Sequence, residues 1–203
     1  MIFEGKQISI PLPQTCLMAI HSVAVFCGSK TGNDPLFAIH TSELGTLLAA
    51  NGIRLVYGGG NVGIMGLVAD TVMAAGGEVT GIIPQVLVEW ERQHTGITTL
   101  IIAANMHERK KMMYDLCDAA IILPGGFGTL DELFEMITWN QLSIHDKHIF
   151  ILNTNGFYDH LIRHIEVMQQ QGFLYETAVQ RLRYASDPAG IIEYLLSENK
   201  PAA

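Results

Sequence analysis

The feature that most constrains the fold is a regular alternation of short apolar runs with segments of helical periodicity. The apolar runs have the length of β-strands and lie at 21–27, 53–57, 78–83, 98–102, 119–123, 148–152 and 181–185. Helical segments separate them, and a last one closes the chain at 188–197. Strands separated by helices pair in parallel through right-handed crossovers. The sequence therefore predicts an α/β fold, a Rossmann-like doubly wound parallel sheet of about six or seven strands with helices on both faces.

Local signals place the ends of several helices. Asp34 and Pro35 are typical of an N-cap followed by the first helical residue, and Asn51-Gly52 is typical of the end of the same helix. Asn105 is predicted to cap a second helix, with Glu108 three residues on as its capping-box partner.

The domain organisation is expected to be simple. No linker, repeat or low-complexity segment interrupts the 203 residues, so we expect one Rossmann-like domain over 19–203 after an N-terminal extension over 1–18. The first residues lack the basic start of a signal peptide, and Pro11 and Pro13 break them. No apolar run approaches the ~20 residues that span a bilayer. These features predict a cytoplasmic protein without a membrane partner.

Charge and metal-ligand spacing exclude several classes of partner. The net charge of −8 argues against a nucleic-acid partner, which favours a basic surface. The three cysteines show no CxxC spacing and the eight histidines no HExxH spacing, which predicts neither a metal nor a disulfide framework. A small anion remains compatible with an acidic chain, because local amides and one or two cations can hold it.

Three predicted strands run directly into glycine-rich turns: Gly28-Ser29, GGGNVGIMG over 58–66, and PGGFGT over 124–129. Ligands of open α/β sheets bind at the carboxyl ends of the strands. Glycine allows close backbone approach to a phosphate, and a following helix start offers unpaired N–H groups. One such turn is most often a tight connection, but three at one edge favour an anionic ligand. The turns lack the G-x-G-x-x-G spacing and the Walker lysine, which excludes NAD binding and ATP hydrolysis.

The helix that follows Asn105 carries an arginine where an apolar residue is expected. At roughly 100° per residue, Arg109 falls in the middle of a stripe formed by Met106, Met112, Met113, Leu116 and Cys117. A buried guanidinium requires an anionic partner. An internal salt bridge and a ligand-binding or catalytic role explain Arg109 equally well. Lys110 lies at the edge of the stripe and Lys111 on the opposite, solvated face.

Glu132 lies in the first turn of the helix that follows PGGFGT. It can simply complement the helix dipole, or it can face the packed side and bind ribose hydroxyls or a water. Asp131 and Glu135 are predicted to point outward. Glu91 and His94, taken alone, are more typical of solvated loop groups than of ligands.

Together with MHERK, the segment PGGFGTLDE closely resembles the LONELY GUY family of cytokinin riboside 5'-monophosphate phosphoribohydrolases, once labelled lysine decarboxylases. The family motif P-G-G-x-G-T-x-x-E is complete at 124–132, and the resemblance extends over about 21–173. It implies a homodimer that hydrolyses the N-glycosidic bond of a cytokinin-type nucleoside 5'-monophosphate to free base and ribose 5-phosphate. No cofactor is expected, and nothing marks the Schiff-base lysine that a pyridoxal decarboxylase needs.

The resemblance implies roles for individual residues. Arg109 and Glu132 match the catalytic pair. The predicted substrate-binding residues, which include those of the glycine turns, are Glu91, Arg109, Lys110, Gly28, Ser29, Gly59, Gly60, Gly125, Gly126, Phe127, Gly128, Thr129, Leu130, Asp131, Glu132 and Thr138. The chain departs from the family at Lys30, where serine is frequent, at Ser143, where glycine is usual, and at His148, where proline is usual.

Two other functions remain open from the sequence. One is a general AMP nucleosidase with no preference for prenylated bases. The other is a non-catalytic nucleotide-binding or carrier protein that uses the same glycine turns. The Arg109 and Glu132 pair discriminates against the second, because a protein that only binds a nucleotide does not need it.

Overall fold

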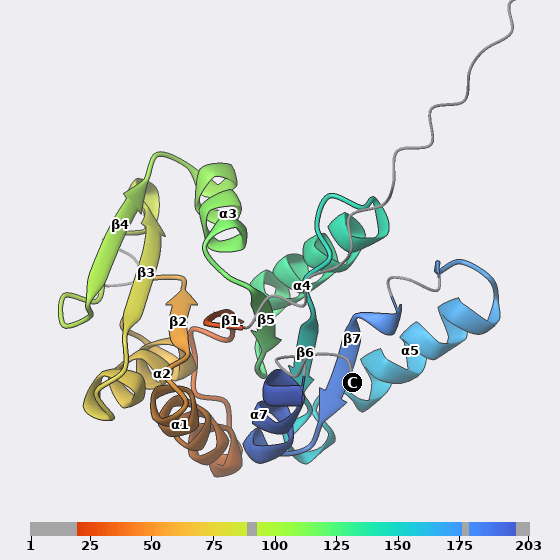
Figure 1. Ribbon diagram of the computed structural model, residues 1–203, viewed down its shortest axis with the longest axis horizontal. Helices are drawn as coiled ribbons and strands as arrows, with labels where there is room; N and C mark the ends of the chain where they lie inside the picture. The colour runs from red at the N-terminus through yellow and green to blue at the C-terminus, as the bar shows by residue number, and fades with distance from the viewer. Residues whose placement is uncertain (1–19, 89–92, 176–178, 198–203) are drawn as a thin grey trace, which may run out of the picture.

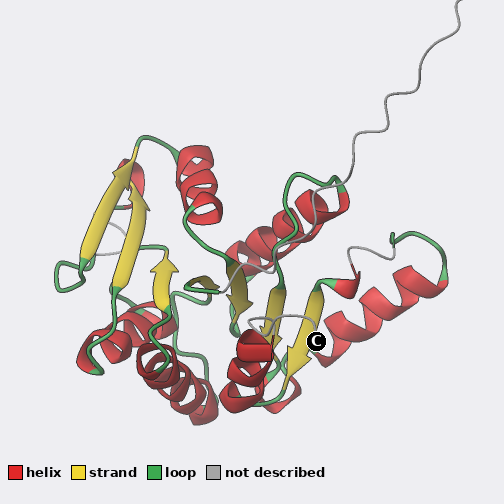
Figure 2. Ribbon diagram, in the orientation of Figure 1, coloured by secondary structure: helices red, strands yellow, loops and turns green. Residues whose placement is uncertain are grey.

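The core of the molecule is a single seven-stranded parallel sheet (Figures 1 and 2). The computed structural model describes residues 20–88, 93–175 and 179–197. The strands are β1 (Ser22–Phe26), β2 (Arg54–Tyr57), β3 (Val79–Pro84), β4 (Thr99–Ala103), β5 (Ala119–Ile122), β6 (Ile149–Leu152) and β7 (Leu182–Ala185). They lie in the order β4-β3-β2-β1-β5-β6-β7, and every neighbouring pair is parallel. The predicted fold class is confirmed.

Helices connect the strands: α1 (Pro35–Ala50), α2 (Gly63–Ala74), α3 (Met106–Asp115), α4 (Phe127–Gln141), α5 (Asp159–Gln170) and α7 (Pro188–Ser197). Short 3-10 turns lie at Gln85–Leu87 and Thr154–Gly156. The predicted caps are present, since Asp34 Oδ1 accepts from the Leu36 N–H at 2.9 Å and Asn105 Oδ1 accepts from the Glu108 N–H at 2.9 Å. The Glu108 carboxylate accepts from the Ala104 N–H rather than from Asn105. In the described part of the chain, no helix has the length and apolar character needed to cross a membrane.

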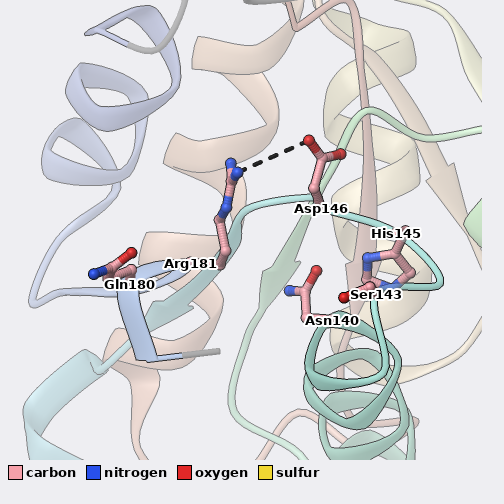
Figure 3. A pocket seen from close by; sticks show the side chains of 6 residues that line it. All are labelled: Asn140, Ser143, His145, Asp146, Gln180 and Arg181. Carbon is pink, nitrogen blue, oxygen red and sulfur yellow. Dashed lines mark ion pairs between the residues drawn. The ribbon is translucent and has the colours of Figure 1, made fainter. Parts of the chain in front are cut away.

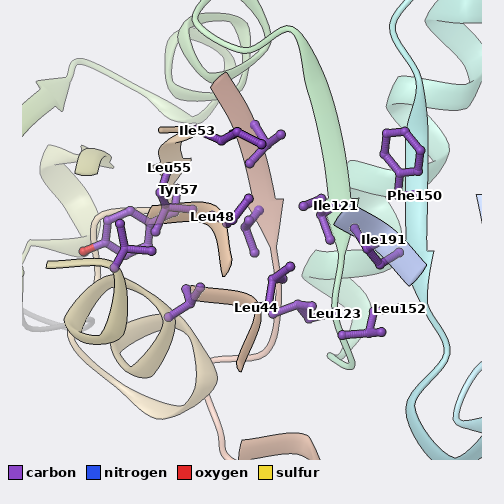
Figure 4. Close-up of a cluster of buried hydrophobic side chains, with 14 of the residues drawn as sticks. Leu44, Leu48, Ile53, Leu55, Tyr57, Ile121, Leu123, Phe150, Leu152 and Ile191 are labelled. Carbon is purple, nitrogen blue, oxygen red and sulfur yellow. The ribbon is translucent and has the colours of Figure 1, made fainter. Parts of the chain in front are cut away.

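Two hydrophobic cores cover the two faces of the sheet, because successive strand residues point to opposite faces. Val23 and Val25 of β1 join the core beneath α1, α2 and α7 (Figure 4), whereas Ala24 and Phe26 join the core beneath α3, α4 and α5. All four are essentially inaccessible to solvent. This burial on both faces explains why the central strands read as continuous apolar runs.

The order of the strands reverses at β1. From β1, the chain builds outward through β2, β3 and β4, and then returns to place β5 on the other side of β1. The helices that follow β1 and β5, α1 and α4, therefore lie on opposite faces of the sheet, and the crevice at the carboxyl edge between these two connections is where doubly wound sheets bind ligands.

Candidate active site

The three glycine turns predicted from the sequence meet at this crevice. The Gly28 N–H donates to the Pro124 carbonyl at 3.1 Å, and the Met65 N–H donates to the Gly28 carbonyl at 3.3 Å. Gly63 has a φ of +57°, and a side chain on it would collide with the Ser29–Lys30 peptide. The turns after β1, β2 and β5 are thus in backbone contact, which only residues without a side chain permit at this position.

The start of α4 is open to an anion. Its N-cap is Gly126, which has no side chain to accept from the first-turn N–H groups, whereas α1 and α3 are capped by Asp34 and Asn105. Uncapped N–H groups and the positive end of the helix dipole favour a bound anion. Thr129 is buried, and its hydroxyl lies so close under Gly125 that a side chain there would collide with it.

A cavity of about 380 Å³ lies beside this turn. It is bounded by Gly28, Ser29 and Lys30 on one side and by 124–126 on the other, with Phe37 and Phe157 among its apolar walls. A positive helix end, backbone turns and an apolar wall are features of a small-molecule site.

Arg109 and Glu132 form a buried ion pair at the same edge. Arg109 Nη1 lies 3.2 Å from Glu132 Oε1, and the residues are 8% and 7% exposed. Arg109 Nε also donates to the Ile82 carbonyl at 3.2 Å, and the guanidinium packs so closely on Gly58 that no side chain fits there. The inward position predicted for Arg109 is confirmed, and its partner is the other predicted catalytic residue. The internal salt bridge and the candidate catalytic pair are therefore the same two groups.

Lys110 is held by two carboxylates of α4. Its ammonium lies 2.7 Å from Asp131 Oδ2 and 3.0 Å from Glu135 Oε2. Burial lowers the pKa of Lys110, but the two carboxylates outweigh burial and the net shift is upward. Glu135 also accepts from the Tyr114 hydroxyl at 2.7 Å. The prediction that Glu135 points outward was wrong, because its position on α4 turns it toward α3.

The buried face of α3 differs from the predicted stripe. Arg109, Met113 and Tyr114 are the buried residues of this helix, whereas Met106 and Leu116 are more than a third exposed. The reason is that α3 packs on two neighbours at once. It lies against the sheet at β3 and β4, and Tyr114 contacts Trp139 of α4, with ring centroids 4.9 Å apart. Lys111 is 68% exposed and pairs with Asp115, as its predicted solvated position requires.

Of the remaining predicted site residues, some lie at the start of α4 and one lies away from it. Gly126, Phe127 and Gly128 are exposed at the start of α4, and Leu130 is half-buried. Thr138 lies nine residues beyond Thr129, is exposed, and donates its hydroxyl to the Phe134 carbonyl, so this chain does not bring it to the turn.

The turn after β2 is buried, and this burial involves a residue that the sequence predicted to be solvated. The Gly59 carbonyl accepts from the His94 N–H at 2.9 Å, and Gly60 forms an isolated bridge with Gln93. His94 is only 5% exposed, and its ring lies 3.0 Å from Asp70. The prediction for His94 was wrong, because the loop folds back onto the turn. Glu91 lies outside the described residues.

A second cavity, of about 430 Å³, lies at the opposite edge of the sheet (Figure 3). Its lining residues precede β6 and β7, and Arg181 and Asp146 approach each other there at 3.8 Å. The residues drawn are Asn140, Ser143, His145, Asp146, Gln180 and Arg181. It shares no residue with the glycine turns, so we place the site at the carboxyl edge.

The fold and this edge define a Rossmann-like protein, and its sequence matches a known family. The family described as "Possible lysine decarboxylase" matches residues 65–195. A probable cytokinin riboside 5'-monophosphate phosphoribohydrolase of Oryza sativa subsp. japonica is 47% identical over 152 residues, 75% of this chain and 68% of the relative. A cytokinin riboside 5'-monophosphate phosphoribohydrolase of Arabidopsis thaliana is 44% identical over 156 residues, 77% and 73% of the two chains. The chain belongs to the LONELY GUY family, and the predicted resemblance is confirmed.

Two solved structures with the same fold belong to more distant proteins. The molybdenum cofactor binding protein of Rippkaea orientalis superposes with a TM-score of 0.67 at 23% identity, covering 87% of this chain and 95% of its own. The molybdenum cofactor carrier protein of Chlamydomonas reinhardtii gives a TM-score of 0.65 at 18% identity, covering 87% and 98%. At these identities the likeness concerns the fold alone.

Proposed function

We propose that the chain hydrolyses the N-glycosidic bond of cytokinin-type nucleoside 5'-monophosphates, releasing the free base and ribose 5-phosphate. The observation that carries this proposal is the buried Arg109–Glu132 pair beside the uncapped start of α4. The relatives at 44–47% identity, which are named for this activity, support the same assignment.

In the proposed mechanism, the first-turn N–H groups of α4 bind the 5'-phosphate over 125–129. The bond between the base nitrogen and C1' of the ribose breaks with its electron pair leaving on the base, and the sugar acquires oxocarbenium character. The Glu132 carboxylate stabilises that positive charge and holds the ribose hydroxyls or the attacking water. The water oxygen bonds to C1', and its two protons end on the new hydroxyl and on the departing base.

Arg109 has two roles in this proposal. Its hydrogen bonds to Glu132 and to the Ile82 carbonyl hold the carboxylate in one orientation. Its charge also anchors the phosphate or the ribose. The predicted contacts at Glu91, Lys110, Gly59 and Gly60 belong to the same proposal.

We also propose that the enzyme is a cytoplasmic homodimer. Apolar side chains on α3 and α4 are exposed, with Met106, Leu116 and Phe134 each more than a third accessible, and a second chain would cover them. The family resemblance implies the dimer, and the cytoplasm is where nucleotides are available as substrates.

The proposal is tested by incubating the protein with AMP and with a cytokinin riboside 5'-monophosphate, and measuring free base and ribose 5-phosphate. We expect faster release of the prenylated base. Equal rates would identify a general AMP nucleosidase. Binding of both nucleotides without release of either base would identify a carrier and contradict hydrolysis.

A further inference from the structure

We propose that Lys30 supplies the positive charge that recognises the substrate's 5'-phosphate and so contributes to the specificity for phosphorylated nucleosides. This inference rests on the proposed function, because it assigns a group to the same phosphate subsite. It concerns a residue at which this chain departs from the serine frequent in its family.

The backbone of Lys30 lies where the three glycine turns meet. A side chain on Gly63 would collide with the Lys30 amide nitrogen, and a side chain on Gly28 would lie 3.3 Å from both the Lys30 carbonyl oxygen and Gly125 Cα. The backbone of Lys30 is therefore held between the turn after β2 and the turn that leads into α4. Its freedom is confined to the side chain, which is long enough to follow a bound anion.

Lys30 borders the space that the phosphate would occupy. It lines the cavity of about 380 Å³ together with Gly125 and Gly126, and a further cavity of about 430 Å³ with Gly32 and Gly63. Lys30 is exposed, and among the described residues it has no ion-pair partner. Asp34, the nearest acidic residue in sequence, is occupied by the Leu36 N–H and by Asn155.

The electrostatics of α3 and α4 favour such a cation. Arg109 and Lys110 face the three carboxylates of Asp131, Glu132 and Glu135, so this part of the site is acidic before the substrate arrives. A phosphate monoester carries a charge of about −1.5 to −2 at neutral pH. The chain as a whole adds a net charge of −8. The Arg109 charge is already paired with Glu132, whereas Lys30 is a nearby positive charge that no carboxylate of the described residues compensates.

The test compares Lys30→Met with Lys30→Arg and with the control Lys111→Met on the exposed face of α3. Isothermal titration with ribose 5-phosphate measures the phosphate subsite without catalysis, and steady-state base release from AMP measures KM and kcat. We expect Lys30→Met to weaken ribose 5-phosphate binding and to raise KM for AMP, each by roughly tenfold, with little change in kcat. Lys30→Arg should restore both, and added salt should narrow the difference.

Two outcomes would separate this inference from the proposed function. If Lys30→Met bound ribose 5-phosphate as tightly as Lys111→Met does, the role of Lys30 would be refuted whatever the enzyme hydrolyses. If the unmodified chain released no base from any nucleotide, but Lys30→Met still lost affinity for ribose 5-phosphate, Lys30 would remain the phosphate cation and the hydrolytic function would be rejected.

Discussion

At the scale of single residues, the site depends on one buried ion pair. Arg109 and Glu132 are both more than nine-tenths buried, and each is the counter-charge that the other requires. Taking two charges out of water is costly, and such a pair is weak evidence for a purely stabilising role. Its position beside the uncapped helix start makes a catalytic role the better explanation of its presence.

Glu132→Gln is expected to retain the fold and to lose at least about a hundredfold in turnover. The amide oxygen can still accept from Arg109, but a neutral group cannot offset the positive charge that develops on the sugar. The measurement is base release from AMP per folded molecule, with thermal unfolding recorded in parallel. A lowered melting temperature with undiminished activity would show that Glu132 serves only stability.

Arg109→Ala and Lys111→Ala form a matched pair two residues apart on α3. The first leaves the Glu132 carboxylate buried without this partner, and we expect severe loss of activity with about 3–5 kcal/mol lower stability. The second removes an exposed pair with Asp115 and should change the free energy of unfolding by less than about 0.5 kcal/mol. Urea unfolding and base release measure both effects. Similar losses in the two variants would contradict the assignment of the two helix faces.

At the scale of elements, the helix ends explain much of the local geometry. Helices α1, α2 and α5 each end two residues before a glycine with positive φ, at Gly52, Gly76 and Gly172. Helix α4 uses the same arrangement with Ser143, whose φ is +57°. The Ser143 N–H donates to the Asn140 carbonyl at 3.0 Å, and the Ile144 N–H to the Trp139 carbonyl at 2.9 Å. These are the two hydrogen bonds of a Schellman motif, which favours glycine.

Ser143→Gly is therefore expected to stabilise the protein. The left-handed conformation costs a residue with a side chain about 1–2 kcal/mol, and glycine avoids that cost while losing more entropy on folding. We expect a net gain of about 1 kcal/mol, which corresponds to a rise in Tm of about 2–4 °C for a chain of this size. Calorimetry measures it, and Ser143→Ala is the control. Equal Tm values for the two variants would contradict the backbone explanation.

At the scale of the whole molecule, the negative net charge of the protein repels the anionic nucleotide that the site is proposed to bind. The net charge of −8 does not attract a nucleotide from a distance, so local donors at the switch between β1 and β5 must hold the phosphate. Binding energy from that remote group can then position the glycosidic bond for attack.

Adenosine is therefore expected to be a very poor substrate compared with AMP. Without the 5'-phosphate, the turns around Gly28 and Gly125 bind nothing, and the bond to the base is not held near Glu132. Adenine release from the two compounds at equal concentration measures the difference in kcat/KM. Comparable rates would show that the phosphate site over 125–129 is misassigned.

The sequence by itself determined the fold class, the order of the elements and the edge of the sheet at which the glycine turns gather. These depend on interactions within a few residues: strand and helix periodicity, the caps at Asp34 and Asn105, and glycine directly after a strand. Because the strands are parallel, their carboxyl ends must lie at one edge. The inward position of Arg109 also follows from the helical period, although Met106 and Leu116 of the predicted stripe are exposed.

Only the tertiary structure decided which groups meet. Arg109 and Glu132 are 23 residues apart on different helices, and their hydrogen bond depends on how α3 and α4 pack side by side on one face of the sheet. The same packing places the Lys147 ammonium on the carbonyls that end α3, turns Glu135 toward Lys110, and buries His94 against the turn after β2. No local pattern specifies such contacts, because each is formed by the chain crossing from one element to another.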